Sequence, residues 1–208
     1  MLVRFQRHAL AALAALAAGA LMAGCTAREN ARTDTTSSAG AIADSGVGAS
    51  GTVSHHGWTD GEILAYTIAA NSGEVGEARV AERKATNAAV KKYAQQIARD
   101  HQALLDESTA FAKQHTIMPD TTQDAVADLM KGAHDEIQDL SNKPAGRDFD
   151  ADYIDKQIDG HKDVLDKLKD AESATTNPQL KTMLTKTIGK VQEHLTKAED
   201  IKQNQLKS

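Results

Sequence analysis

Apolar residues recur along much of the chain at alternating spacings of four and three, which is the pattern of helices that bury one face. One such series begins at Val90 and another at Ile154, and each contains a histidine at an inward position, His101 and His161. An imidazole therefore takes the place of an aliphatic side chain on two separate helices. The first series consists of Val90, Ala94, Ile97, His101, Leu104, Ser108, Phe111 and His115.

Local signals predict where the helices begin and end. Thr59 and Glu62 have the spacing of a capping box, and Asn177 followed by Pro178 is typical of a helix start. Either Thr121 or Thr122 is expected to cap a shorter helix after Pro119. We expect helices at about residues 60–84, 88–115, 122–141, 148–174 and from 178 onward.

The middle of the first helix is poor in helix-forming residues. Gly73 and Gly76 each cost about 1 kcal/mol of helix stability relative to alanine. The sequence leaves two explanations open, close approach of another helix or a local bulge.

The predicted fold is all-α. The chain has 208 residues and few aromatic residues, so we expect one domain over residues 58–205. Short connections between successive helices favour an antiparallel bundle, with four long helices around the core and one extra short helix. The formal net charge is -5, and basic residues are interleaved with acidic ones, so no nucleic-acid surface is expected.

The N-terminal residues resemble an export signal, with Arg4 and Arg7 before an apolar run. Residues 21–25 resemble a bacterial lipobox, which predicts a lipoprotein-type signal peptide over residues 1–24 and lipidation of Cys25. Residues 25–57, rich in Ser, Thr, Gly and Ala, are expected to form a disordered tether. The expected location is the periplasm, attached to a membrane through the lipid, and Thr26 after the cysteine favours the outer membrane.

Several inward polar residues are predicted to lie at similar heights in the bundle. In an antiparallel hairpin, residues equidistant from the turn share a height, with about 1.5 Å of rise per residue. This estimate predicts a candidate metal site in the core of the bundle. Asp100 and Asp159 are the carboxylates expected to support its ligands. The candidate ligands are Glu74, Glu77, His101, His161 and His194.

Carboxylates and imidazoles in a bundle core suit iron, manganese, copper or zinc. The Glu-x-x-His pair of di-iron bundles is missing, because Ala98, Ile158 and Val191 precede the three histidines by three positions. A polar network that fixes helix register is the alternative interpretation.

Five segments resemble the domain-of-unknown-function family 4142, whose members are often called predicted outer-membrane proteins. The resemblance implies a ferritin-like helical bundle exported from the cytoplasm, and it departs from the family pattern at Gly76 and Gly160. It implies functional positions at Glu74, Asp100, His101, His161 and His194. The segments are residues 71–77, 85–101, 148–153, 157–161 and 193–195.

Two functions follow as expectations. The first is a lipid-anchored, non-enzymatic protein of the periplasm or outer membrane with a binding or envelope-associated role. The second is a ferritin-like metal-binding protein or metalloenzyme that uses the inward histidines and glutamates for redox chemistry or metal storage. A protein partner or a homo-oligomer is compatible with either function. No nucleophile motif, phosphate-binding loop or cysteine cluster points to a hydrolase or a nucleotide-binding protein.

Overall fold

The computed structural model describes residues 57–206, and this range contains five α-helices and no strand. The all-α prediction is therefore confirmed. The predicted signal peptide, Cys25 and residues 26–56 of the predicted tether lie outside the described residues. The helices are α1 (Asp60–Lys84), α2 (Ala88–Gln114), α3 (Asp124–Asn142), α4 (Arg147–Ala174) and α5 (Pro178–Asn204).

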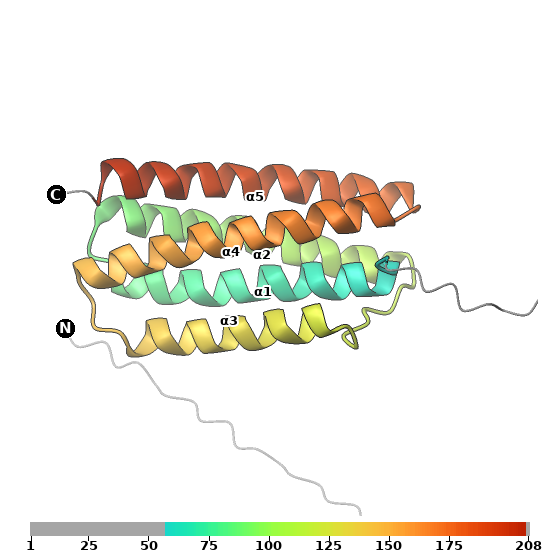
Figure 1. The fold of residues 1–208 in the computed structure, drawn as a ribbon, viewed down its shortest axis with the longest axis horizontal. Coiled ribbons are helices and arrows are strands. Elements are labelled where there is room, and N and C mark those ends of the chain that lie inside the picture. The colour runs from blue at the N-terminus through green and yellow to red at the C-terminus, as the bar shows by residue number, and fades with distance from the viewer. Residues whose placement is uncertain (1–56, 207–208) are drawn as a thin grey trace, which may run out of the picture. The chain divides into compact units, whose positions relative to one another are not determined.

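The helices lie side by side along one long direction, and the chain reverses at each connection (Figure 1). α1 packs against α2, α3 and α4, and α5 packs against α2 and α4. Each of these pairs is antiparallel except α1 and α3, which run in the same direction. The buried apolar residues come mainly from α1, α2, α4 and α5, whereas α3 contributes only Val126 and Leu140. α3 thus lies against the outer side of α1.

Side-chain caps begin α1, α2 and α5. The Thr59 hydroxyl accepts from Glu62 N at 3.2 Å, and the Glu62 carboxylate accepts from Thr59 N at 2.8 Å, which completes the capping box. Asn87 and Asn177 accept from the first amides of α2 and α5. α3 differs, because it starts after Gln123 without a side-chain cap. The prediction that Thr121 or Thr122 caps α3 was wrong.

Two polar contacts hold the turns of the bundle in register. Asp150, which is 1% exposed, accepts from the backbone amides of Thr86 and Asn87 at 3.0 and 2.8 Å. At the other end, Asp60 accepts from the Thr175 hydroxyl at 2.7 Å. Because α4 holds the α1–α2 turn and α1 holds the α4–α5 turn, the inward faces of all four helices are fixed relative to one another.

The glycines of α1 allow α3 to approach closely. A Cβ atom at Gly73 would lie 2.7 Å from the Cβ of Ala133, and one at Gly76 would lie 2.5 Å from Ile137 Cδ1. α1 is continuous through this segment. Of the two explanations for these glycines, close approach is confirmed and the bulge is not found.

No helix in the described part of the chain combines the length and the apolar character that crossing a membrane requires.

Candidate metal site

Three histidines from three helices meet in the core. His101 of α2, His161 of α4 and His194 of α5 are 2%, 1% and 0% exposed. Each offers one ring nitrogen such that the three nitrogens lie within 4.8 Å of one another. The ring centroids are 5.0 to 5.7 Å apart. The inward helix faces predicted from the apolar spacing thus converge on one cluster of imidazoles.

A neighbouring amide fixes the protonation of His101. His101 Nδ1 lies 2.8 Å from Asn71 Oδ1, while Asn71 Nδ2 donates to the carbonyl oxygen of Thr67 at 2.8 Å. This second bond orients the Asn71 amide so that its oxygen faces the imidazole. An amide oxygen only accepts, so Nδ1 of His101 carries the hydrogen. Nε2 of His101 is left with its lone pair.

A carboxylate fixes the protonation of His194 in the same way. His194 Nε2 lies 2.9 Å from Asp100 Oδ2. Burial raises the pKa of Asp100, but hydrogen bonds from His194 and Gln96 outweigh this and lower it overall. Asp100 is therefore ionised at neutral pH and accepts the hydrogen of Nε2. Nδ1 of His194 is left with its lone pair.

These two lone pairs face each other. His101 Nε2 and His194 Nδ1 are 3.2 Å apart. In two neutral rings with these tautomers, neither of the two nitrogens carries a hydrogen. A proton between them is disfavoured, because burial lowers the pKa of His101 well below its usual range and the other two imidazoles lower it further. Burial also lowers the pKa of His194, although the hydrogen bond to Asp100 opposes this. Two acceptor lone pairs thus face each other, and either a metal ion bound to both nitrogens or a water molecule that donates to both would relieve their repulsion.

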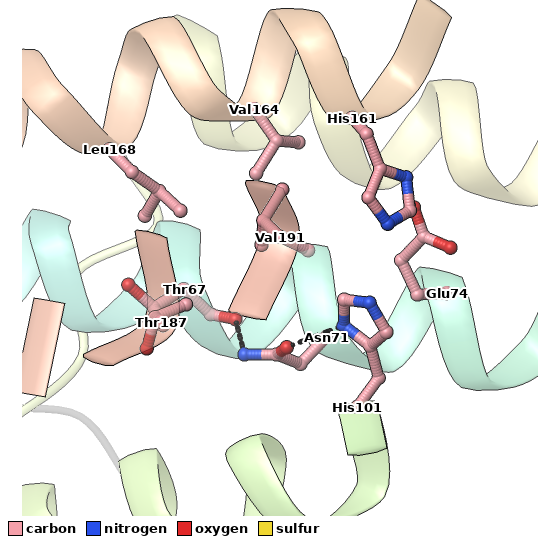
Figure 2. Close-up of a pocket in the computed structure, with 10 residues that line it drawn as sticks. Thr67, Asn71, Glu74, His101, His161, Val164, Leu168, Thr187 and Val191 are labelled. Carbon is pink, nitrogen blue, oxygen red and sulfur yellow. Dashed lines mark hydrogen bonds and ion pairs between the residues drawn. The ribbon is translucent and has the colours of Figure 1, made fainter. Parts of the chain in front are cut away.

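The third histidine lies beside a carboxylate. His161 Nδ1 is 3.3 Å from Glu74 Oε1, and neither ring nitrogen of His161 has a hydrogen-bond partner among the described residues. Figure 2 shows Glu74 next to the His161 ring, with His101 on the facing side of a small cavity. The cavity has about 10 Å³ of space for the centre of a water molecule, which is the room that one water needs. A ligand of that size fits beside the imidazoles.

A polar stripe on α4 extends the site along the bundle. Tyr153, Gln157 and His161 follow one another at spacings of four, and each has a buried polar atom without a hydrogen-bond partner among the described residues. Gln157 Nε2 donates to Glu74 Oε2 at 2.8 Å and to Glu77 Oε2 at 3.3 Å. Burial raises the pKa of Glu77 well above its usual range, and the nearby Glu74 adds to this. Glu77 therefore reaches the cluster only through Gln157 and Glu74.

The structure separates the sequence-predicted residues into two groups. Glu74, Asp100 and the three histidines are in contact with one another, and Glu77 lies one hydrogen-bonded side chain away. Asp159 instead is exposed and faces the charge of Lys202. It is not among the described contacts of the imidazoles, so a role in supporting a ligand does not fit its position.

Sequence reasoning missed Asn71 and Gln157 as parts of the site. Asn71 is 2% exposed and Gln157 is 1% exposed, and both hydrogen-bond members of the cluster. The signal for Asn71 was its predicted height, level with His101. The signal for Gln157 was its position four residues before His161 on the same face of one helix.

The arrangement has the features of a transition-metal site. Two nitrogens bound to one tetrahedral ion at about 2.0–2.1 Å are separated by about 3.3 Å. The distance between the facing nitrogens of His101 and His194, 3.2 Å, is close to that separation. His101 and His194 each have an oxygen beside the ring nitrogen that faces away from the other ring, as metal-binding histidines commonly do. His161 must approach the other two rings before all three can bind a single ion.

A family model described as "Domain of unknown function (DUF4142)" matches residues 44–201. The chain belongs to the DUF4142 family. In this DUF4142 chain, the matched range includes the three histidines, Glu74 and Asp100. No curated protein and no solved structure matches the chain. The family description gives no activity, so the chemistry of this DUF4142 chain has to be inferred from its own side chains.

Proposed function

We propose that the chain is an exported metal-binding protein that holds one divalent transition-metal ion at His101, His161 and His194. The observation that carries this proposal is the pair of imidazole lone pairs facing each other at 3.2 Å. One ion accepts both lone pairs and removes their repulsion. Glu74 supplies the negative charge nearest to His161 and is the fourth ligand in this proposal.

The donor set narrows the choice of metal. Three neutral imidazoles and one carboxylate suit zinc, copper or iron better than manganese, which prefers oxygen ligands. By the usual order of affinities, copper binds most tightly among the ions that suit imidazole. The lowered pKa values of His101 and His194 keep both rings neutral at pH 7, the form that binds metal.

We also propose the finer architecture and location that the sequence implies. α1, α2, α4 and α5 correspond to the four long helices of a ferritin-like antiparallel bundle, with α3 as the extra helix. A lipid on Cys25 would attach the domain to the outer membrane from the periplasmic side. The Cys25→Ser variant is expected to move from the membrane fraction to the soluble fraction, and unchanged fractionation would argue against lipidation.

Metal titration of the full chain tests the proposed function. The chain, purified without a histidine tag and stripped with a chelator, is titrated with Zn²⁺, Cu²⁺ and Mn²⁺. A His55→Ala/His56→Ala background removes this adjacent pair of histidines as a weak site. We expect one bound ion per chain. At an ion concentration of about 100 times Kd, the free energy of unfolding should rise by about 2.7 kcal/mol.

Matched histidine variants separate a site from a structural network. His161→Ala should weaken binding at least about 100-fold. His115→Ala, at an exposed histidine that follows the last residue of α2, should bind as the wild type does. A wild-type chain that stays metal-free with every ion, or a His161→Ala chain that binds normally, would instead favour the polar network.

A further inference from the structure

A second and larger pocket lies on the outer side of Glu74. It is open, has a volume of about 220 Å³ and is lined by α1, α3 and α4. Three residues, Ala70, Glu74 and Val164, line both this pocket and the small cavity beside the histidines. In Figure 2, Glu74 lies next to His161 at the edge of the small cavity. The Glu74 carboxylate therefore stands between the buried cluster and the open pocket.

Carboxylates line this pocket from its mouth to its inner end. Asp128 and Asp163 are exposed, Glu136 is half-buried, and the side chain of Glu74 is 13% exposed. The only basic residue among the described lining is Lys156. None of Asp128, Glu136 and Asp163 makes a side-chain hydrogen bond or an ion pair with another described residue. Lys156 offsets part of this charge at Glu77 and Glu136, but carboxylates outnumber it, and a net negative lining increases the local concentration of cations.

Two helix-interior glycines keep the pocket open. Gly132 of α3 and Gly160 of α4 line it, and a Cβ atom added at either position would meet no atom within 4 Å. Each glycine costs its helix about 1 kcal/mol relative to alanine. Neither is needed for close packing or for a positive φ. Because both residues line the pocket, a larger side chain at either position would start from the pocket wall.

An independent feature at the inner end points to a ligand. The His161 side chain is 1% exposed, both of its ring nitrogens are without hydrogen-bond partners among the described residues, and its Nδ1 lies 3.3 Å from Glu74. His161 also follows Gly160 directly in the sequence. His161 lines the small cavity and not the pocket, so Glu74, which lines both, separates the pocket carboxylates from this buried imidazole.

We propose that this pocket is the passage through which a hydrated divalent metal ion reaches the three histidines, with Glu74 as the group that transfers it inward. The pocket has about 220 Å³ of space for the centres of water molecules. One water needs roughly 10–15 Å³ of such space, so the ion enters with waters still bound. The small cavity beyond Glu74 has room for about one water, so the ion loses most of its hydration shell at Glu74. This inference rests on the proposed function.

Filling the pocket tests the passage separately from the site. In the full chain, Gly160→Leu places a side chain in the pocket, and Gly189→Leu is the matched control. Gly189 is a helical glycine on α5 with no atom within 4 Å of an added Cβ, and it does not line the pocket. Stopped-flow mixing with Co²⁺, followed by its visible absorption, gives the association rate, and chelator competition gives the dissociation rate.

If the passage is blocked, the association and the dissociation of the metal ion slow by the same factor. Gly160→Leu should lower the association and dissociation rates at least about tenfold each, and Kd should stay within about twofold, because the end states are unchanged. Gly132→Leu, which enters the pocket from α3, should do the same. Wild-type rates in both leucine variants would overturn the passage while leaving the site intact. A wild-type chain that binds no metal overturns the proposed function itself.

Charge variants test the role of the acidic lining. Asp128→Asn combined with Asp163→Asn should lower the Co²⁺ association rate about tenfold at low ionic strength, and the difference should shrink in about 0.5 M salt. Asp159→Asn, at an exposed acid on α4 outside the pocket, should leave the rate unchanged. Equal rates for the double variant and the control would exclude steering through this pocket.

Discussion

Two layers of the core differ in what their buried groups do. We call the end near the start of α1 the apolar layer, and the middle, where three imidazoles and an amide are buried, the histidine layer. The apolar layer consists of Ile63, Leu64, Leu168, Leu180 and Leu184, all at most 1% exposed. The histidine layer consists of Asn71, Glu74, His101, His161 and His194.

The two layers differ in how they affect the free energy of unfolding. Each large aliphatic side chain in the apolar layer stabilises the fold by about 1.5–3 kcal/mol through burial. The histidine layer gives up that stabilisation and also buries ring nitrogens of His161 without hydrogen bonds. A layer that weakens the metal-free protein is expected to be compensated when its ligand binds. Substitutions in the two layers should therefore have opposite effects.

The largest expected effect is in the apolar layer. Leu64→Ala should lower the free energy of unfolding by about 2–5 kcal/mol, because it removes a fully buried side chain and leaves a cavity. Metal affinity of the folded protein should not change, since Leu64 lies seven residues before Asn71 on α1, which is about 10 Å along the helix from the histidine layer. Chemical denaturation and metal titration measure the two quantities.

The control for Leu64→Ala is Met130→Ala. Met130 is 52% exposed. Its truncation should change the free energy of unfolding by less than about 0.5 kcal/mol, as is usual for surface substitutions. Equal losses in the two variants would contradict the stabilising role of the apolar layer.

The apolar layer and most of the fold follow from local sequence rules. The capping box at Thr59 and the Asn177-Pro178 start depend only on neighbouring residues, so they could be predicted. The start of α3 could not be predicted from neighbouring residues in this way. The side chain of Asp120 accepts from Thr122 N at 2.9 Å, which places Thr122 in a turn and delays the helix to Asp124.

The heights in the histidine layer were predictable, and so were the inward directions of His101 and His161, but Asp159 was assigned from its height alone. Counting residues from each turn placed His101, His161 and His194 at similar levels, and the structure brings them together. The same counting placed Asp159 near His194. Asp159 precedes His161 by two residues, which turns it about 200° around α4 and onto the surface.

The partners of the imidazoles depend on finer geometry. Asn71 and Gln157 act through the orientation of their amides, which only the neighbouring hydrogen-bond groups decide. No spacing rule in the sequence contains that information. The sequence therefore predicts which helices meet at the site, and the structure is needed to say which ring nitrogens are free.

A substitution in the histidine layer should raise the free energy of unfolding, whereas Leu64→Ala should lower it. In the metal-free protein, His161→Leu should raise the free energy of unfolding by about 1–3 kcal/mol, the cost of a buried polar group without a hydrogen bond. The same variant should lose the stabilisation by Zn²⁺. Thermal unfolding with and without the ion measures both effects. If His161→Leu destabilises the metal-free protein, the histidine layer contributes to stability as a network and the contrast between the layers is wrong.

The support of His194 can be tested without removing any imidazole. Asp100→Asn keeps the shape of the side chain but removes the charge that holds the hydrogen on His194 Nε2. We expect about a 10–100-fold loss of Zn²⁺ affinity, the usual effect of changing a group behind a metal ligand. Glu193→Gln removes a nearby charge that pairs with Lys190 and should leave the affinity close to the wild-type value. Equal affinities in the two variants would exclude this role for Asp100.

The smallest expected effect concerns Glu77 and has a defined pH dependence. Burial raises the pKa of Glu77 in the folded protein above the ordinary value of 4.5, so the folded state holds a proton that the unfolded state releases above pH 4.5. Stability is therefore lost as the pH rises above about 4.5. Glu77→Gln removes this loss and should stabilise the metal-free protein at pH 7 by about 1 kcal/mol, the usual size of a single substitution.

At pH 4 the advantage of Glu77→Gln should vanish, because Glu77 is then protonated in both states. The buried histidines have the opposite effect on the pH dependence of stability. The lowered pKa values of His101 and His194 mean that the unfolded state takes up protons first, so their effect reduces stability as the pH falls below about 6.5 in both the wild type and the variant. The difference between the two denaturation curves therefore isolates Glu77. A difference that stays constant from pH 4 to pH 7 would show that the gain arises from packing and not from the buried proton.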